Sequence, residues 1–387
     1  MHHPTTHFFD LTPDALTERC LERGWPKFRA NQIMEWVYQK GVSDPQQMTT
    51  LSKREREQLA AEMTFLSGDT IAHQRATDGT QKLLIEWSDT NEHRAQARWP
   101  EDVSSANPAL SLPTLPATAN PYTDLGTDPT RQTECVMIPA EDRRTACISS
   151  QVGCPVGCRF CASGLSGLDG NLSAGRIVEQ AWRLGRLDKV GRISNVVFMG
   201  MGEPLANFKA VTNAVRTLAS PWGMGISARK ITVSTVGMHK AIERLADELE
   251  LPITLALSLH APNDDLRRSL IPWAEYTSID QLFEACDAWF KKTGREITLE
   301  YTLLRGVNDR PHHAKELADV AKRLRATVNL IRYNEVEGLP YERPVHDDVH
   351  AFQKTLLDAK VRAHIRASRG RDIAAACGQL RHETAAQ

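Results

Sequence analysis

Strand-like and helix-like runs alternate along the chain from about residue 144 onward, and this rhythm limits the fold more than any other feature of the sequence. Short apolar runs such as "KITVSTVG" and "ITLALSLHA" are separated by longer runs with apolar residues at helical spacing, such as "NFKAVTNAVRTLAS". The alternation is typical of βα units, in which helical crossovers join parallel strands. We therefore expect an α/β fold with a parallel sheet of about six strands, either an open barrel or a doubly wound sheet.

Polar residues stand at the ends of these strand-like runs. In both architectures the functional groups collect at the carboxyl ends of the parallel strands. Ser and His at such positions more commonly satisfy backbone groups of the βα turns, so the pattern alone does not identify a ligand. The candidate residues at these ends are Glu203, Ser234, Ser258, His260 and Asn334.

The first part of the chain has a different character. Residues 10 to 65 predict a small helical bundle, because "TPDALTERCLER" begins with Thr-Pro and "RANQIMEWVYQKG" repeats apolar residues at helical spacing. Two strands are predicted next, at "QKLLIEW" and "HRAQARW". From Pro100 to Arg131 the chain is rich in Pro, Ser, Thr and Ala without periodicity, which predicts a long, mobile loop.

Three cysteines lie close together in "CPVGCRFC", at Cys154, Cys158 and Cys161. Eight cysteines in 387 residues are too few and too unevenly spaced for a disulfide framework, so the cluster indicates a metal or catalytic site. A structural zinc site needs four ligands, and the nearest downstream histidine is the distant His239. A [4Fe–4S] cluster held by three thiolates leaves one iron open for another ligand, so the spacing favours iron and sulfide over zinc.

Charge and hydropathy exclude other classes. The 47 Lys and Arg nearly balance the 48 Asp and Glu, so the surface as a whole does not attract nucleic acid. Any RNA contact must come from a local patch such as Lys53, Arg54 and Arg56, although basic residues on a helix are usually only a solvated face. No signal peptide begins the sequence and no apolar run approaches about 18 residues, so we expect a cytoplasmic protein without a membrane segment.

The three-cysteine spacing, followed by "MGMGEP", resembles the radical S-adenosylmethionine (SAM) enzymes. Further segments, "TECVMIPAEDRRTACISSQVGC", "SLHAPND" and "RGRDIAAACGQL", resemble the RlmN/Cfr family of adenosine methyltransferases acting on ribosomal RNA. The resemblance runs from about Glu134 to the C-terminus. Family members have a short turn in place of the Pro-rich insert, and "ETV" where this chain has "ECV".

The resemblance implies a partial (β/α)6 radical-SAM barrel with a small N-terminal helical domain and a β-hairpin extension. The implied division is an RNA-binding helical domain at 1–68, a β extension at 69–140 with a flexible insert at 100–131, the barrel at 141–375, and a C-terminal segment at 376–387.

Cofactor contacts also follow from the resemblance. It implies a [4Fe–4S] cluster held by Cys154, Cys158 and Cys161, with SAM on its open iron. The residues implied to bind SAM are Gly202, Glu203, Ser234, Ser258, His260 and Asn334. Further partners are an electron donor such as flavodoxin or ferredoxin, and we expect a monomer.

The implied chemistry needs two more sulfur atoms. The C2–H and C8–H carbons of adenine do not attack a sulfonium methyl group directly, so a radical route is required. In the family, a methyl group is first transferred to a cysteine, here Cys377, and is then added to the base as a methylene radical. Cys147 matches the cysteine that resolves the adduct by forming a disulfide with Cys377, and Glu134 matches the general base. Without the resemblance, both thiols would be interpreted as core residues and Glu134 as a solvated carboxylate.

Other basic and sulfur residues receive simpler interpretations. The run Arg366, Arg369 and Arg371 precedes Cys377 and is a candidate for holding RNA phosphates. Of the cysteines that match no catalytic position, Cys286 shares a helical face with apolar residues such as Trp289, which predicts a place in the core.

Three hypotheses of function remain at this point. The first is methylation of C2 of an adenosine in 23S rRNA and in tRNA, with two SAM molecules per turnover, and we favour it because it is the commoner housekeeping activity. The second is C8 methylation of the same rRNA adenosine, which gives antibiotic resistance in the Cfr branch. The third is a non-catalytic RNA-binding or iron–sulfur protein, although such a protein has no use for a resolving thiol. A relative acting on a small molecule is a further alternative.

Overall fold

A long mixed sheet forms the centre of the protein. The structure is a computed structural model that describes residues 6–88, 129–165 and 167–380. Within these residues, ten strands follow one another across the sheet in the order of the chain. They are β1 (Gly68–Arg75), β2 (Gln81–Trp87), β3 (Gln132–Ala140), β4 (Arg143–Cys147), β7 (Asn195–Phe198), β8 (Ile231–Thr235), β9 (Thr254–Ser258), β10 (Ile297–Leu303), β11 (Ala326–Arg332) and β12 (Ala363–Arg366).

The parallel part of the sheet is an open barrel. Strands β4 and β7 to β12 pair in parallel, each with the next in chain order. A doubly wound sheet reverses its strand order at a switch point, and no reversal occurs here, so that alternative is wrong. The described residues therefore form seven parallel strands, β4 and β7 to β12, close to the expected number of about six.

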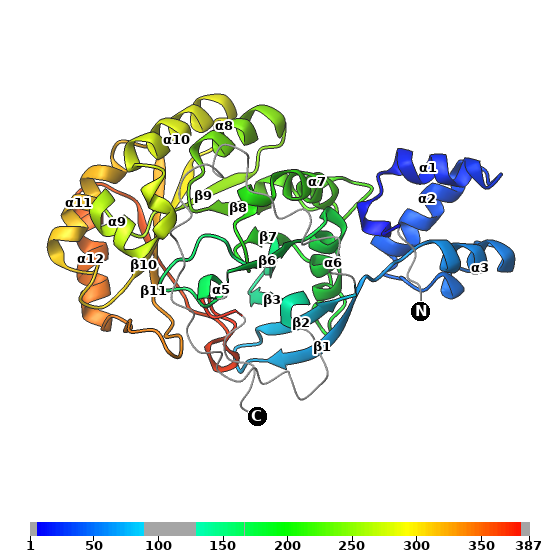
Figure 1. The fold of residues 1–387 in the computed structure, drawn as a ribbon, viewed down its shortest axis with the longest axis horizontal. Helices are drawn as coiled ribbons and strands as arrows, with labels where there is room; N and C mark the ends of the chain where they lie inside the picture. The colour runs from blue at the N-terminus through cyan, green and yellow to red at the C-terminus, as the bar shows by residue number, and fades with distance from the viewer. Residues whose placement is uncertain (1–5, 89–128, 166, 381–387) are drawn as a thin grey trace.

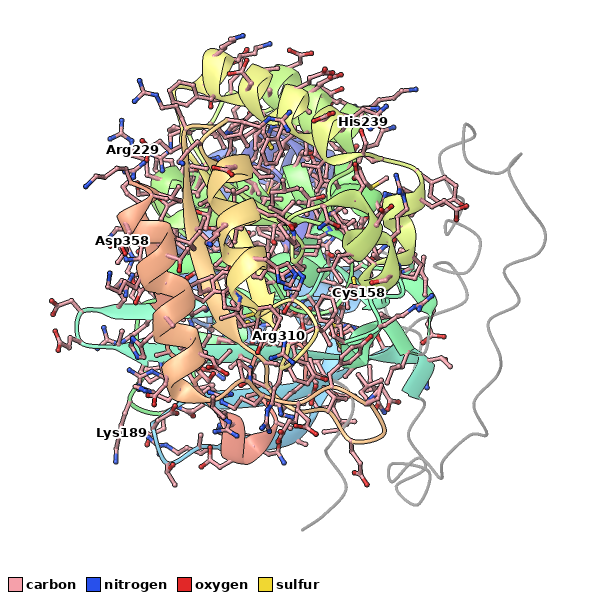
Figure 2. All side chains as sticks on the ribbon, turned by 90° about the vertical axis from the view of Figure 1, so that its left-hand side faces the viewer. Cys158, Lys189, Arg229, His239, Arg310 and Asp358 are labelled. Atoms are coloured by element: carbon pink, nitrogen blue, oxygen red, sulfur yellow. The ribbon has the colours of Figure 1, made fainter. Side chains whose placement is uncertain are left out.

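Helices cover the outside of the barrel (Figure 1). Figure 2 shows side chains filling the space between helices and sheet, while the charged ends of Lys189 and Arg229 reach the periphery. The helices of this layer are α6 (Ala174–Leu184), α7 (Phe208–Ala219), α8 (His239–Glu248), α9 (Asp264–Leu270), α10 (Ile279–Thr293), α11 (Pro311–Ala321) and α12 (His346–Asp358).

Helix α10 illustrates how the sequence determines these elements. Ser278 and Gln281 form a capping box at its start, and Gly294 ends it in the left-handed conformation with φ of +66°. Cys286 and Trp289 are fully buried on its inner face, which confirms the prediction that Cys286 is a core residue.

The N-terminal helices pack against the barrel through α6. They are α1 (Pro13–Glu22), α2 (Phe28–Met34), which continues as a π-helical turn (Glu35–Gln39), and α3 (Lys53–Glu62). Thr12 caps α1, as the Thr-Pro start predicts, and accepts a hydrogen bond from the Ala15 amide. The Trp182 ring on α6 contacts Phe9, and its indole nitrogen donates to the Val37 carbonyl at 2.8 Å. One continuous apolar core therefore joins the bundle to the barrel.

The β extension differs in part from the prediction. The strand expected at "QKLLIEW" is β2, but its hairpin partner is β1, and the segment "HRAQARW" lies outside the described residues. Most of the Pro-rich insert also lies outside them. Strand β1 reads "GDTIAHQR" and is half exposed with a bulge near Thr70, so it lacks the regular alternation that predicts a strand. No helix among the described residues is long and apolar enough to cross a membrane.

Candidate active site

The cysteine loop leaves a small two-stranded sheet and ends on a short helix. It runs from β5 (Gln151–Gly153), which pairs with β6 (Leu168–Asn171), to α5 (Ala162–Leu165). The Cys154 amide donates to the Gly167 carbonyl at 2.7 Å, and the Cys161 amide donates to the Cys158 carbonyl at 3.2 Å. These backbone bonds hold the loop so that all three thiols line one cavity.

The three thiols fit the ligand set of an iron–sulfur cube. Each side chain is partly exposed to the cavity, and burial of the surrounding loop raises the pKa of all three thiols. They are therefore protonated until a metal displaces the protons. In the described part of the chain, no three His, Cys, Asp or Glu side chains converge on the position of a single ion. A cube does not need such convergence, because each thiolate binds a different iron at a different corner.

The strand-end residues lie where the sequence predicts. Gly202, Glu203, Ser234, Ser258 and His260 line the same cavity as the three cysteines, at the carboxyl ends of β7, β8 and β9. The cavity opens to solvent, and the space between its walls, open solvent included, is about 880 Å³.

Glu203 is fixed between two strand ends. One carboxylate oxygen accepts from the Val236 amide at 2.8 Å and the other from the Leu205 amide at 3.0 Å. Burial raises its pKa, while these two amides oppose the shift. Each carboxylate oxygen has a further lone pair, so the group can still accept from a ligand ammonium. Gly202 before it has φ of +100°, and a Cβ there would lie 2.7 Å from the Gln151 Cβ, so the turn requires glycine.

His260 is a neutral donor that lines the same cavity. Burial lowers its pKa to about 3, so the ring carries no charge at neutral pH. Its Nδ1 accepts from the Thr302 amide at 3.0 Å, which places the remaining ring proton on Nε2. Beside it, the hydroxyls of Ser234 and Ser258 lie 3.3 Å apart. The wall therefore offers hydroxyl and N–H groups to a polar ligand.

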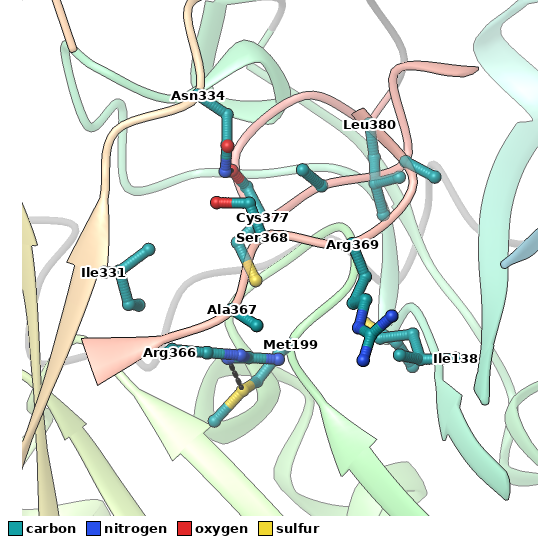
Figure 3. A pocket seen from close by; sticks show the side chains of 13 residues that line it. Ile138, Met199, Ile331, Asn334, Arg366, Ala367, Ser368, Arg369, Cys377 and Leu380 are labelled. Carbon is teal, nitrogen blue, oxygen red and sulfur yellow. Dashed lines mark hydrogen bonds between the residues drawn. The ribbon is translucent and has the colours of Figure 1, made fainter. Parts of the chain in front are cut away.

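Figure 3 shows a second cavity. It adjoins the first, because the two share lining residues. It has about 540 Å³ of open space and is lined by Cys147, Cys377 and Asn334 among others. Cys377 and Arg366 line both cavities, so the two meet at these side chains. Asn334 lies only on the second cavity, where its amide donates to the Cys377 carbonyl at 3.3 Å. It therefore contacts the Cys377 segment rather than sharing the cavity of the other strand-end residues.

The two cysteines of the second cavity are free thiols in the structure. Burial raises the pKa of Cys147 to about 12, and the nearby Arg366 guanidinium opposes this shift. The Cys377 sulfur in turn raises the pKa of Arg366, so the Arg366 guanidinium stays charged beside the two cysteines. Arg366 also contacts the Met199 sulfur at 3.4 Å and faces inward, unlike the exposed Arg369 and Arg371. Of the basic run before Cys377, only Arg369 and Arg371 therefore remain candidates for phosphate contacts.

Glu134 lies apart from both cavities. It is fully buried in the middle of β3, and its carboxylate forms an ion pair with Lys82 at 2.8 Å. It is not the solvated carboxylate that the residues alone suggest. Strand β3 pairs with β4, and Val136 on β3 lies opposite Cys147 on β4. Glu134 is therefore on the strand next to that of Cys147.

Sequence reasoning missed Lys82 and the inward position of Arg366. A signal for Lys82 was present, because it stands in "QKLLIEW" among residues that are apolar on both faces of the strand. A lysine that is buried in a strand needs a partner of opposite charge.

Comparisons with known proteins agree with this geometry. Residues 148–318 match the radical SAM superfamily, and residues 6–65 match the ribosomal RNA large subunit methyltransferase N-terminal domain. A probable dual-specificity RNA methyltransferase RlmN from Gloeobacter violaceus is 42% identical over 98% of this chain and 96% of its own length. The dual-specificity RNA methyltransferase RlmN from Bdellovibrio bacteriovorus is 37% identical over 97% of this chain and 83% of its own.

A solved structure gives the same result for the fold. The crystal structure of a radical SAM methyltransferase from Sphaerobacter thermophilus superposes with a TM-score of 0.84 and 38% identity, covering 97% of this chain and 99% of that one. Enzymes of the radical SAM superfamily use a [4Fe–4S] cluster and SAM, and the three thiols and the adjoining cavity fit both groups. The chain therefore belongs to the RlmN family of radical SAM RNA methyltransferases.

Proposed function

We propose that this enzyme methylates C2 of a specific adenosine in 23S rRNA, and of an adenosine in tRNA, using Cys377 as the carrier of the methyl group. The observation that carries the proposal is the place of Cys377 at the junction of two cavities, with Cys147 on the wall of the second. The words "dual-specificity" in the names of the relatives support two kinds of RNA substrate.

The first cavity is the proposed cofactor site. When bound, the cluster and SAM supply a methyl group and the radical that activates it. Cys154, Cys158 and Cys161 hold the cluster, and the Glu203 carboxylate accepts from the methionyl ammonium. The hydroxyl and N–H groups of Ser234, Ser258 and His260, together with the Gly202 backbone, bind the remaining polar groups. Asn334 acts from the second cavity, through the Cys377 backbone.

Cys377 is the proposed methyl acceptor. A thiolate is the reactive form of cysteine, and a neighbouring positive charge stabilises it. The Arg366 guanidinium lies beside Cys377 on the wall common to both cavities and supplies this charge (Figure 3). The position of Cys377 at the junction of the two cavities lets the methyl carbon on its sulfur face the cofactor on one side and the RNA base on the other.

Release of the product requires two groups of the chain. Once the base is joined to Cys377 through a methylene carbon, the radical adduct must lose its unpaired electron, which the oxidised cluster would accept, and Glu134 takes the proton from the ring carbon. The Cys147 sulfur then attacks the Cys377 sulfur, so that an S–S bond forms and the S–CH2 bond breaks. The electron pair of that bond passes to the carbon, which takes a proton and becomes the methyl group. Cellular thiols reduce the disulfide before the next turnover. Because Glu134 is fully buried in the structure, the chain around it must move before the base reaches it.

The partners follow from this chemistry. The RNA contacts the exposed Lys53 and Arg54 on the N-terminal helices and Arg369 and Arg371 beside the second cavity. A one-electron donor such as flavodoxin or ferredoxin reduces the enzyme, and a monomer suffices because the described residues of one chain form both cavities. The RNA substrates and reducing thiols indicate the cytoplasm as the compartment.

The test is reconstitution without oxygen, with reductant, SAM and unmodified rRNA or tRNA, followed by mass spectrometry of the adenosines. C2-methyladenosine is expected, and C8-methyladenosine would support the Cfr-like alternative instead. Cys147→Ala should trap RNA covalently on the protein, while Cys377→Ala should abolish both product and adduct. A Cys377→Ala enzyme that still methylates RNA would refute the mechanism.

A further inference from the structure

Lys82 is a buried cation that none of the catalytic steps above uses. It is 2% exposed in β2, and its ammonium pairs with the Glu134 carboxylate at 2.8 Å. In the register of β2 and β3, Leu84 faces Glu134 and Lys82 faces Val136, so Lys82 and Glu134 are diagonal neighbours on one face of the sheet.

The same ammonium reaches the C-terminal segment. It donates to the Ala374 carbonyl at 3.3 Å, three residues before Cys377. An ammonium has three donors and no acceptor, so one side chain serves both the carboxylate and the carbonyl. The group thereby connects the proposed proton acceptor with the backbone that carries the proposed methyl acceptor.

The turn before Lys82 holds the beginning of this segment. Asp78 accepts from the Gly370 amide at 3.0 Å, and Asp372 accepts from the Thr77 amide at 2.9 Å. A Cβ at Gly370 would lie 2.8 Å from the Thr80 methyl group, so the two backbones are in close contact. The C-terminal segment is therefore anchored on the hairpin at two places, which are the turn that carries Thr77 and Asp78 and the side chain of Lys82. Of these two anchors, only Lys82 also contacts Glu134.

The burial of Glu134 makes its partner important for chemistry. A carboxylate buried without a counter-charge takes up a proton rather than remain ionised. A protonated carboxyl group has no capacity to accept the proton of the ring carbon. The Lys82 ammonium lies 2.8 Å from Glu134 Oε1 and is the partner of opposite charge that a buried carboxylate needs.

We propose that Lys82 is a positioning residue that keeps the Glu134 carboxylate ready to accept the ring proton and ties it to the segment carrying Cys377. The inference rests on the proposed role of Glu134 as the base. In the step concerned, the C–H bond of the adduct breaks, an O–H bond forms on Glu134, and the bonding electrons stay in the ring. Lys82 remains charged throughout and transfers no proton.

The experiment separates the steps of turnover in the reconstituted holoenzyme. Three quantities are measured: S-methylation of Cys377 by intact mass, covalent RNA–protein adduct on denaturing gels, and methylated adenosine. Lys82→Gln keeps the shape and removes the charge, and Lys82→Arg keeps the charge. Asp78→Asn is the matched control, because it weakens the other anchor of the segment without touching Glu134. Glu134→Gln tests the assigned base itself.

Lys82→Gln is expected to methylate Cys377 within about twofold of the unmodified enzyme, to accumulate adduct, and to lose product at least tenfold. Lys82→Arg should release product, whereas Asp78→Asn should show the normal ratio of adduct to product at a lower rate. If Lys82→Gln does not fold, the Lys82→Arg variant tests the proposal instead. Because this variant keeps the positive charge, complete accumulation of its RNA–protein adduct without product would overturn the proposed role of the Lys82 charge. Equal trapping in Asp78→Asn would also overturn it, because loosening of the segment would then be the cause.

Two outcomes distinguish this inference from the proposed function. If Glu134→Gln accumulates the adduct while Lys82→Gln releases product normally, the proposed role of Lys82 is refuted and the assignment of Glu134 as the base stands. Glu134→Gln that forms product normally refutes the assignment of Glu134 as the base, and the role of Lys82 with it.

Discussion

Replacement of Glu179 by Gln is expected to weaken the attachment of the N-terminal helices to the barrel. The Glu179 carboxylate is fully buried on α6 and accepts from the Ser67 amide at 2.9 Å and the Ser67 hydroxyl at 2.8 Å. It also pairs with His7 at 3.0 Å and Arg183 at 2.7 Å. Breaking a buried ion pair from one side costs about 3–5 kcal/mol, and since Gln still accepts from Ser67, we expect about 3 kcal/mol.

The effect depends on pH through His7. Burial alone would lower the pKa of His7, but the hydrogen bonds that its ring donates to Asp10 and Glu179, together with their charges, outweigh this effect and raise the pKa above 6.5. The stabilisation from charged His7 is therefore complete below pH 6.5 and is lost as the pH rises through the raised value. For Glu179, burial favours the neutral form, but His7 and Arg183 lower its pKa below 4.5. Its contribution is complete above pH 4.5 and is lost as the pH falls through the lowered value, so the attachment is strongest between about pH 4.5 and 6.5.

The assay is urea denaturation of the holoenzyme, with unfolding monitored by tryptophan fluorescence. Trp182 reports on this interface, because its ring contacts Phe9 and its indole nitrogen donates to the Val37 carbonyl. Glu248→Gln is the control, since Glu248 pairs with Arg244 on the exposed surface and such pairs contribute little. A midpoint for Glu179→Gln equal to that of the control at pH 6 would refute the reasoning. So would a His7→Gln variant whose loss of stability is the same at pH 6 and pH 9.

Two predictions concern the cofactor cavity. Gly202→Ala should reduce the affinity for SAM at least tenfold in equilibrium dialysis, while the cluster still assembles. The reason is that the added Cβ, at a φ of +100°, would lie 2.7 Å from the Gln151 Cβ and displace Glu203. An unchanged affinity for SAM would contradict this prediction. Cys158→Ala should lower the metal content of reconstituted protein well below about four irons per chain and remove the brown absorbance, whereas Cys286→Ala in the core should keep both.

The strand-end residues were predictable because a single local rule positions them. The alternation of βα runs determines which residues end each strand, and parallel pairing brings those ends to one edge of the sheet. Glu203, Ser234 and Ser258 therefore reach one cavity although they are far apart in the chain. Their partners, such as the Val236 amide, also follow from this edge because they are backbone groups of the same turns.

The remaining features depend on contacts between segments that no local pattern links. Asn334 ends a strand as predicted, yet it lies on the second cavity because the C-terminal segment passes in front of it. Arg366 stands in a basic run that is typical of a solvated face, but it ends β12 beside Met199 and faces inward. Glu134 is covered because the hairpin supplies Lys82 from a strand about 50 residues earlier in the chain. Each of these positions is determined by tertiary packing.

The irregular backbone around Cys377 explains how one sulfur can serve two cavities. The segment is no continuous helix: a short 3₁₀ turn is followed by Ala374 at φ of +47°, and Gly378 has φ of +86°. The Gly378 carbonyl accepts from the Ala162 amide of α5 at 2.8 Å, and the Gln379 side chain donates to the Glu335 carbonyl at 2.9 Å.

The Cys377 backbone is thus held on both sides, by the hairpin before it and by α5 after it. The Cys377 side chain lines both cavities from this anchored position. A cysteine in the interior of a rigid helix would present its sulfur to one side only. A chemistry in which the same sulfur first accepts a methyl group and then delivers it to RNA therefore favours an anchored, irregular segment at the boundary between the two cavities.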